Sequence, residues 1–324
     1  MKIAVYGAGA IGAMLGARLG AAGHDVTLIA RGAHLAAMRE RGLHVKSAVF
    51  GEQRYDVKAT ESPEEVGEVD YVILGIKAQG IPGIAPRVAS LLGPETSVLT
   101  TQNGLPWWYF HGVPGHDARL ETVDPGGVIE QHIASERALG SIAYCSCSLE
   151  EPGVVKHTQF NRFPMGEPDG SHSERLRLLT EAFRDADFKA PIRNDIRHEL
   201  WVKLLGNGAF NPLSVLTGKT IIEMIDYPLT NALIRSLMKE IRDTAAAAGV
   251  QIAFSIDKRI EGSRMTGAHK TSMLQDYEAG RSSEIDQIVG AIVELADRYN
   301  VPAPALKAIY AATQLRFENP LKHG

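Results

Sequence analysis

Cysteine is nearly absent from this sequence, whose 324 residues include only Cys145 and Cys147. Two residues apart on an expected strand, the two thiols point to the same face. Two thiolates alone do not complete a zinc site, and a disulfide between them would close a strained loop. No His-Glu-x-x-His or comparable histidine pair is present. We therefore expect two reduced cysteines that serve packing, as in a cytoplasmic protein, and no metal site.

Long apolar runs and an excess of one charge are missing as well. No apolar stretch approaches the roughly 20 residues that span a bilayer, and no cationic segment with a cleavage site opens the chain. The net charge is only −4, which gives no electrostatic basis for binding nucleic acid or a membrane surface. We expect a cytoplasmic protein with neither as a partner. The length predicts two domains.

What the sequence does contain is a glycine-rich turn near its start. The apolar run Lys2 to Tyr6 ends in Gly-Ala-Gly-Ala-Ile-Gly, and an Ala- and Leu-rich segment follows. Strand, turn and helix in this order are the context in which such a motif binds a dinucleotide, with the phosphates at the helix N-terminus. The expected cofactor-binding residues of this turn are Gly7, Ala8, Gly9, Ala10, Ile11 and Gly12.

The next apolar run, Val26 to Ala30, indicates which dinucleotide is bound. NAD enzymes usually carry an acidic residue at the end of this strand for the ribose 2′-hydroxyl. Here Arg31 stands at that position, and Asp25 lies at the opposite end. A guanidinium suits a 2′-phosphate, so we predict NADP (NADPH). The alternative is a solvated arginine that opens the next helix.

Strands alternate with helices through the first part of the chain. Apolar runs at 70–76 and 96–101 follow the first two, with helical patterns at 31–41 and 81–92 between them. This alternation predicts an α/β Rossmann-type doubly wound parallel sheet. Lys77 and Asn103 follow two of its strands at the carboxyl end, where such sheets bind ligands.

Other strands are expected around this sheet. Runs at 43–49 and 55–59 predict a hairpin at its edge, and 141–149, 154–158 and 163–166 predict antiparallel strands that complete it. The pattern changes near Pro191, and from Asn194 onward it is nearly all helical. We therefore expect domains at 1–190 and 191–324, the second all-α.

Residues 105–136 are irregular and contain Trp107-Trp108-Tyr109-Phe110. An exposed aromatic cluster is unfavourable in water, so we expect this segment to fold over something. A lid over the nicotinamide site and a surface that faces a partner both remain open.

One helix of the second domain carries a polar pattern. Lys203, Asn207 and Asn211 follow one another at steps of four, which places all three on one face. A solvated face is one reading of this pattern. With Gly206 and Gly208 beside the amides, we favour a face that lines a polar cleft.

These residues, taken together, carry a resemblance. The chain resembles ketopantoate reductases (2-dehydropantoate 2-reductases) over nearly its full length. The stretches that match are 2–12, Lys77, Asn103-Gly104, 197–207, 211–213, 272–276 and 284–286. The resemblance implies NADPH-dependent reduction of ketopantoate to pantoate, on the route to pantothenate, by a Rossmann domain and a helical domain.

The resemblance also implies roles for individual residues. Lys203 matches the catalytic lysine, and Glu284 matches an acidic active-site residue. Asn207, Asn211 and Ser272 match positions that contact substrate. Lys77 and Asn103 match residues at the nicotinamide end, and Arg31 matches the 2′-phosphate contact.

Three departures bear on the substrate. His269 stands where the family resemblance leads us to expect an asparagine. Gly218-Lys219-Thr220 replaces the Asn-Gly-Glu-Leu type of sequence often seen in the family, and the aromatic segment is longer than in its compact members. A paralogue that reduces another 2-keto acid is therefore one alternative. A non-catalytic NADP(H)-sensing protein is a second, and the sequence leaves a homodimer open.

Overall fold

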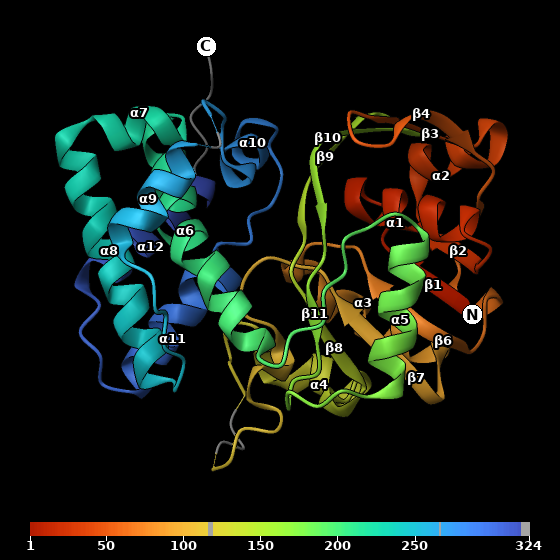
Figure 1. Cartoon of the computed structure of the whole chain (residues 1–324), viewed down its shortest axis with the longest axis horizontal. Coiled ribbons are helices and arrows are strands. Elements are labelled where there is room, and N and C mark those ends of the chain that lie inside the picture. The colour runs from red at the N-terminus through yellow and green to blue at the C-terminus, as the bar shows by residue number, and fades with distance from the viewer. Residues whose placement is uncertain (116–118, 266, 319–324) are drawn as a thin grey trace. The chain divides into compact units, whose positions relative to one another are not determined.

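The computed structural model describes residues 1–115, 119–265 and 267–318, and these divide into two compact units (Figure 1). Unit 1 consists of residues 1–102, 106–119 and 124–196, and unit 2 consists of residues 103–105, 120–123 and 197–324. Because two short segments of the middle region belong to unit 2, the chain passes between the units more than once. No helix of the described ranges is both long and apolar enough to cross a membrane.

Unit 1 holds a seven-stranded sheet in the order β11-β8-β7-β6-β1-β2-β5, in which only β11 is antiparallel to its neighbour. The five apolar strands at its centre are buried on both faces, as helices on both sides of a parallel sheet require. The predicted Rossmann-type sheet is confirmed. Its strands are β1 (Lys2–Tyr6), β2 (Asp25–Ile29), β5 (Lys58–Thr60), β6 (Val69–Leu74), β7 (Leu92–Thr100), β8 (Ala138–Ser141) and β11 (Met165–Gly166).

A second sheet, in the order β4-β3-β10-β9, lies beside the first. Of the antiparallel strands that we expected to complete the main sheet, the run at 163–166 does so as β11, but the runs at 141–149 and 154–158 contribute β9 and β10 to this separate sheet. The hairpin expected at the edge of the main sheet was wrong, because β3 and β4 pair here and only β5 joins the main sheet. Local patterns predict a strand but not its partner, and here β3 pairs with the distant β10. The strands are β3 (Leu43–Ser47), β4 (Gly51–Tyr55), β9 (Tyr144–Glu151) and β10 (Val154–Arg162).

Five α-helices complete the described part of unit 1, and α1 is the central one. It contacts β1 and β2 of the main sheet and β3, β9 and β10 of the second sheet. All but one of its residues from Gly12 to Leu19 are buried, which its Ala-, Leu- and Gly-rich composition allows. The helices are α1 (Ala10–Ala21), α2 (Gly32–Arg41), α3 (Ile81–Val88), α4 (Val128–His132) and α5 (Glu174–Asp185).

All the regular secondary structure in the described residues of unit 2 is helical, as predicted for the second domain. The long helix α8 buries Ile234, Leu237, Met238, Ile241 and Ala245, at the spacing of one helical face, against its neighbours α7, α9, α11 and α12. A single π-helical turn, Asp286–Gly290, precedes α11. The helices are α6 (Ile196–Thr217), α7 (Ile221–Asp226), α8 (Pro228–Ala247), α9 (Ile256–Arg264), α10 (Ser272–Glu278), α11 (Ala291–Arg298) and α12 (Pro304–Glu318).

The aromatic cluster from Trp107 to Phe110 is part of the core of unit 1. All four residues from Trp107 to Phe110 are buried, with Trp108 only 1% exposed. The indole N–H of Trp107 donates to the Ile133 carbonyl, and that of Trp108 donates to Thr100 Oγ1 at the end of β7. The cluster thus packs at the end of β7, inside unit 1. Its burial contradicts a surface that faces a partner, whereas a lid over the nicotinamide site stays a prediction. Residues 116–118 of the segment 105–136 lie outside the described residues.

This burial predicts the effect of removing one indole. Trp108→Ala should destabilise the protein by about 3–5 kcal/mol, the usual cost of a large core truncation. Denaturant unfolding measures the change, with Tyr227→Ala, at a 57% exposed aromatic, as the control expected to cost under about 1 kcal/mol. Unchanged stability of Trp108→Ala with altered ligand binding would instead indicate a lid.

Candidate active site

The turn between β1 and α1 is held by glycines that interlock. A β-carbon on Gly12 would lie 2.2 Å from the Gly7 carbonyl oxygen, and one on Gly75, after β6, would lie 2.5 Å from the same oxygen. Gly7 itself has a φ of +97°, which favours glycine. The backbone N–H groups of Gly7 and Ala8 both donate to the Ile29 carbonyl at the end of β2. The turn is therefore fixed on three neighbouring strands.

Gly9 differs from the other glycines of the turn. A β-carbon there would meet no described protein atom closer than the Gly75 carbonyl oxygen at 3.6 Å, an ordinary contact. Packing within the protein thus does not require glycine at this position, whereas close approach of an outside group does. Gly9 is also the N-cap of α1, and no side chain caps the helix. The first N–H groups of α1 and its positive dipole end suit a pyrophosphate, so the residues present fit a dinucleotide.

His34 is a neighbour of this turn that sequence reasoning missed. It lies on α2, and its Nδ1 accepts a hydrogen bond of 2.9 Å from Gly153 N, in the turn between β9 and β10. Burial lowers the pKa of His34, and the Ala8 carbonyl only partly offsets this effect. Burial therefore disfavours a positive charge on this ring beside the glycine turn. The contact depends on the distant β9–β10 hairpin, so no local pattern signals it.

Arg31 and Lys77 each follow a strand of the main sheet, β2 and β6, which lie on either side of β1. Arg31 comes two residues after β2 and is the N-cap of α2, with an exposed side chain that makes no hydrogen bond or ion pair to a described residue. No acidic residue stands between β2 and α2. Lys77, three residues after β6, is partly buried and caps a short helical turn. Both lie at the carboxyl ends of parallel strands, as the sequence indicated.

Asn103 belongs to unit 2, apart from the cofactor residues of unit 1. Its side-chain Nδ2 donates to Glu284 Oε2 over 2.9 Å, and Glu284 is 8% exposed. The next residues continue this packing, because Leu105 N donates to the Gln287 carbonyl. A β-carbon on Gly104 would lie 2.4 Å from that same carbonyl oxygen. Two expected site residues, far apart in the sequence, are thus in direct contact.

The polar face of α6 continues into the core of unit 2. Lys203 and Asn207 are partly buried, and Asn211 is 5% exposed. Among the described residues, Asn211 Nδ2 has no hydrogen-bond partner, and neither has Oε1 of the buried Gln287. An orphaned buried polar group costs about 1–3 kcal/mol, so each requires an explanation. On α6 itself, the open donor of Asn211 fits a polar ligand.

The glycines of α6 are explained by packing. A β-carbon on Gly206 would overlap the Arg259 guanidinium, with Nη2 2.1 Å away, and one on Gly208 would lie 2.8 Å from Ile241 Cδ1 of α8. The reading of both glycines as part of a polar cleft is therefore wrong for Gly208, which packs against an apolar side chain. Gly206 instead admits Arg259, which sequence reasoning missed. The Arg259 guanidinium thus lies against Gly206, the residue before Asn207, and a guanidinium can pair with a carboxylate.

Helix α10 is tied to α6 by Thr271, its N-cap. Thr271 is buried, and its Oγ1 lies 2.5 Å from Ser214 Oγ. Ser272, the expected substrate contact, is the first residue of α10 and has an exposed side chain. His269 is exposed as well. The Gly218-Lys219-Thr220 stretch opens α7, where Thr220 and Glu223 form a capping box, so these three residues serve helix termination and initiation.

Comparison with known families agrees with both units. Residues 3–170 match the model of the family described as "Ketopantoate reductase PanE/ApbA", and residues 195–316 match "Ketopantoate reductase PanE/ApbA C terminal". The chain is 45% identical over 315 residues to a 2-dehydropantoate 2-reductase of Mesorhizobium japonicum, with 96% of each chain covered.

Solved structures show the same relationship. The crystal structure of 2-dehydropantoate 2-reductase from Methylococcus capsulatus superposes with a TM-score of 0.85 at 27% identity and 99% coverage of both chains. D-mandelate dehydrogenase with NADH and anilino(oxo)acetate shares the fold at 23% identity, with a TM-score of 0.83 and coverage of 98% of this chain and 99% of the other. The chain belongs to the ketopantoate reductase family of pyridine-nucleotide oxidoreductases.

Proposed function

We propose that this protein reduces ketopantoate to pantoate with NADPH, with the dinucleotide on unit 1 and the keto acid on residues of unit 2. Family membership supports the reaction. The observation that supports the substrate site is the polar face of α6, which consists of Lys203, Asn207 and Asn211. On this face the buried Asn211 Nδ2 is a donor without a partner among the described residues. A keto acid offers the acceptor atoms that such a donor lacks.

Residues of unit 1 would hold the cofactor. The first N–H groups of α1 would bind the pyrophosphate, with Gly9 leaving room for it, and Arg31 would pair with the 2′-phosphate. Lys77 would lie toward the nicotinamide end. When bound, the reduced nicotinamide supplies the hydride. Side chains would then supply the proton and stabilise the negative charge that develops on the substrate oxygen.

Lys203 would complete the chemistry at the ketone. As the carbonyl carbon gains a hydride, negative charge develops on its oxygen, and the Lys203 ammonium would stabilise that charge and donate the proton. Glu284 would orient the reacting groups, with Asn103 held by its hydrogen bond to the Glu284 carboxylate. Asn207, Asn211 and Ser272 would bind the carboxylate and hydroxyl of the substrate.

A cytoplasmic location and a homodimer stay proposals. Sedimentation equilibrium of the purified chain measures the second directly, and a mass of one chain at micromolar concentration would exclude a stable dimer.

Substitution of Lys203 separates charge from proton donation. Lys203→Met should lower kcat by about 10²–10⁴-fold, the usual contribution of a general acid. Lys203→Arg keeps a cation but cannot give up a proton near neutral pH, so it should also be slow. Steady-state kinetics measure both, and the dissociation constant of NADPH should change less than about threefold.

The matched control for this experiment is Lys219→Met. Lys219 is an exposed lysine just beyond α6, paired with Glu223 at 3.0 Å. Its loss should leave kcat unchanged. Full activity of Lys203→Arg would assign Lys203 a purely electrostatic role, and full activity of Lys203→Met would remove it from the mechanism.

Arg31 is expected to select the cofactor. Arg31→Gln should weaken NADPH binding by about 10–100-fold, as the loss of a charge-assisted phosphate contact implies, and should leave NADH binding unchanged. Fluorescence titration with each dinucleotide measures the ratio. Arg39→Gln, which removes the same charge from the same helix, is the control. An equal loss for both dinucleotides would show that Arg31 does not contact the 2′-phosphate.

Substitution of Asn211 should raise the stability of the protein and lower its activity. Asn211→Leu removes the orphaned donor, so it should raise stability by about 1 kcal/mol and Tm by roughly 2–4 °C. The same change should lower kcat/KM for the keto acid at least about tenfold. Asn231→Leu is the control, because Asn231 donates to the Ile225 carbonyl and its loss should lower Tm. A lower Tm with unchanged kinetics in Asn211→Leu would make Asn211 a structural residue.

A further inference from the structure

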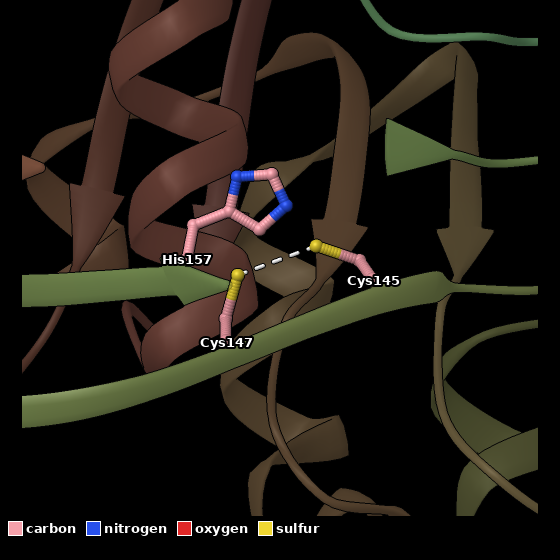
Figure 2. A group of neighbouring side chains, drawn as sticks. All are labelled: Cys145, Cys147 and His157. Atoms are coloured by element: carbon pink, nitrogen blue, oxygen red, sulfur yellow. Dashed lines mark hydrogen bonds between the residues drawn. The ribbon is translucent and has the colours of Figure 1, made fainter. Parts of the chain in front are cut away.

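Unit 1 contains a cluster of metal-ligating side chains away from the dinucleotide turn. Cys145 and Cys147 lie on β9, and His157 lies directly opposite Cys147 on the antiparallel β10 (Figure 2). One ligand atom from each of the three residues falls within 4.8 Å of the others. The β9–β10 register brings the imidazole to the thiols, because directly paired residues share a face of the sheet.

A fourth soft atom comes from α1. The Cys147 thiol donates to Met14 Sδ over 3.5 Å, and the Cys145 and Cys147 sulfurs are 3.3 Å apart. Met14 is fully buried between α1 and the second sheet. Two thiols, a thioether and an imidazole therefore meet in one place. We name this set the sulfur–imidazole cluster: Met14, Cys145, Cys147 and His157.

The imidazole already has the partner that a ligating histidine needs. His157 Nδ1 lies 2.8 Å from Ser47 Oγ, and Nε2 lies 2.5 Å from the Phe160 carbonyl oxygen. A histidine ligand keeps one nitrogen hydrogen-bonded to a neighbour while the other binds the metal. The Ser47 contact can serve this purpose, so Nε2 would exchange the Phe160 carbonyl for the metal.

The backbone at Phe160 permits that exchange. Phe160 has a φ of +60°, which is unfavourable for a large side chain, and its ring is 56% exposed. The β9–β10 register shifts on both sides of Gln159, so the ladder is already interrupted here. Releasing the Phe160 carbonyl would therefore break no regular strand pairing.

The thiols do not have the character of reactive nucleophiles. The hydrogen bond with Cys145 raises the pKa of the Cys147 thiol above its usual range, and burial raises it further. Reactive cysteines have a lowered pKa, which makes the thiolate the resting form. Neither cysteine forms a disulfide.

We propose that the sulfur–imidazole cluster binds one monovalent copper ion. Thiolate and thioether ligands together select Cu(I), whereas structural zinc sites use cysteine and histidine without methionine. Binding forms bonds from copper to three sulfurs and one nitrogen and releases the two thiol protons to solvent. The imidazole stays neutral but changes tautomer: Nε2 loses the proton that it donates to the Phe160 carbonyl, and Nδ1 gains one that it donates to Ser47 Oγ. Copper enters as Cu(I) and leaves the cluster without any change of oxidation state. The ion would join α1 to β9 and so stabilise unit 1.

The test is an anaerobic titration of the reduced, full-length protein with Cu(I) held by a chromophoric competing chelator. We expect one Cu(I) per chain and a higher Tm for the loaded protein, since a ligand of the folded state stabilises it. Tenfold excess Zn²⁺ should leave the copper bound. X-ray absorption of the loaded protein should show three sulfur neighbours and one nitrogen.

Variants distinguish the cluster from any pair of thiols. Cys147→Ser should weaken Cu(I) binding at least 100-fold, and Met14→Leu, which preserves the volume, about 10-fold. Met38→Leu, at an equally buried methionine of α2, is the control and should bind as the parent does. Unchanged affinity in Cys147→Ser would overturn the proposal. So would copper with only two sulfur neighbours, a Met14→Leu variant equal to the parent, or displacement of copper by zinc.

Discussion

The close approach of α1 to the central strands is the constraint on which the structure of unit 1 depends. The Gly7 carbonyl oxygen occupies the space that β-carbons on Gly12 and Gly75 would need, so α1 can reach β1 and β6 only because glycine stands at both positions. This approach aims the N-terminus of α1 outward at the sheet edge. It also brings the buried side of α1, with Met14, against the second sheet.

Much of this arrangement could be predicted from the sequence, because it depends on local patterns. The glycine turn after β1 and the position of Arg31 after β2 follow from strand–turn–helix order alone. The steps of four from Lys203 to Asn211 define one face of a helix whatever surrounds it. These features need no knowledge of which segments meet in space.

What could not be predicted depends on contacts between distant segments. The pairing of β3 with β10 creates a second sheet that no local pattern specifies, and the burial of Trp108 depends on Thr100 at the end of β7. The sequence suggested that Gly206 lines a cleft, because nothing in it shows that Arg259 of another helix, α9, packs against this glycine. His157 could not be placed from the turn alone either, because a hairpin turning at Pro152-Gly153 would set it opposite Ser148, and a register shift after Val154 brings it opposite Cys147.

The central claim is that the protein is a reductase of a 2-keto acid that uses NADPH. The most direct measurement is the oxidation of NADPH by the purified chain with ketopantoate, beside related 2-keto acids and an NADH control. The account predicts fast turnover with ketopantoate and a clear preference for NADPH. Tight binding of NADPH without turnover on any keto acid would contradict it.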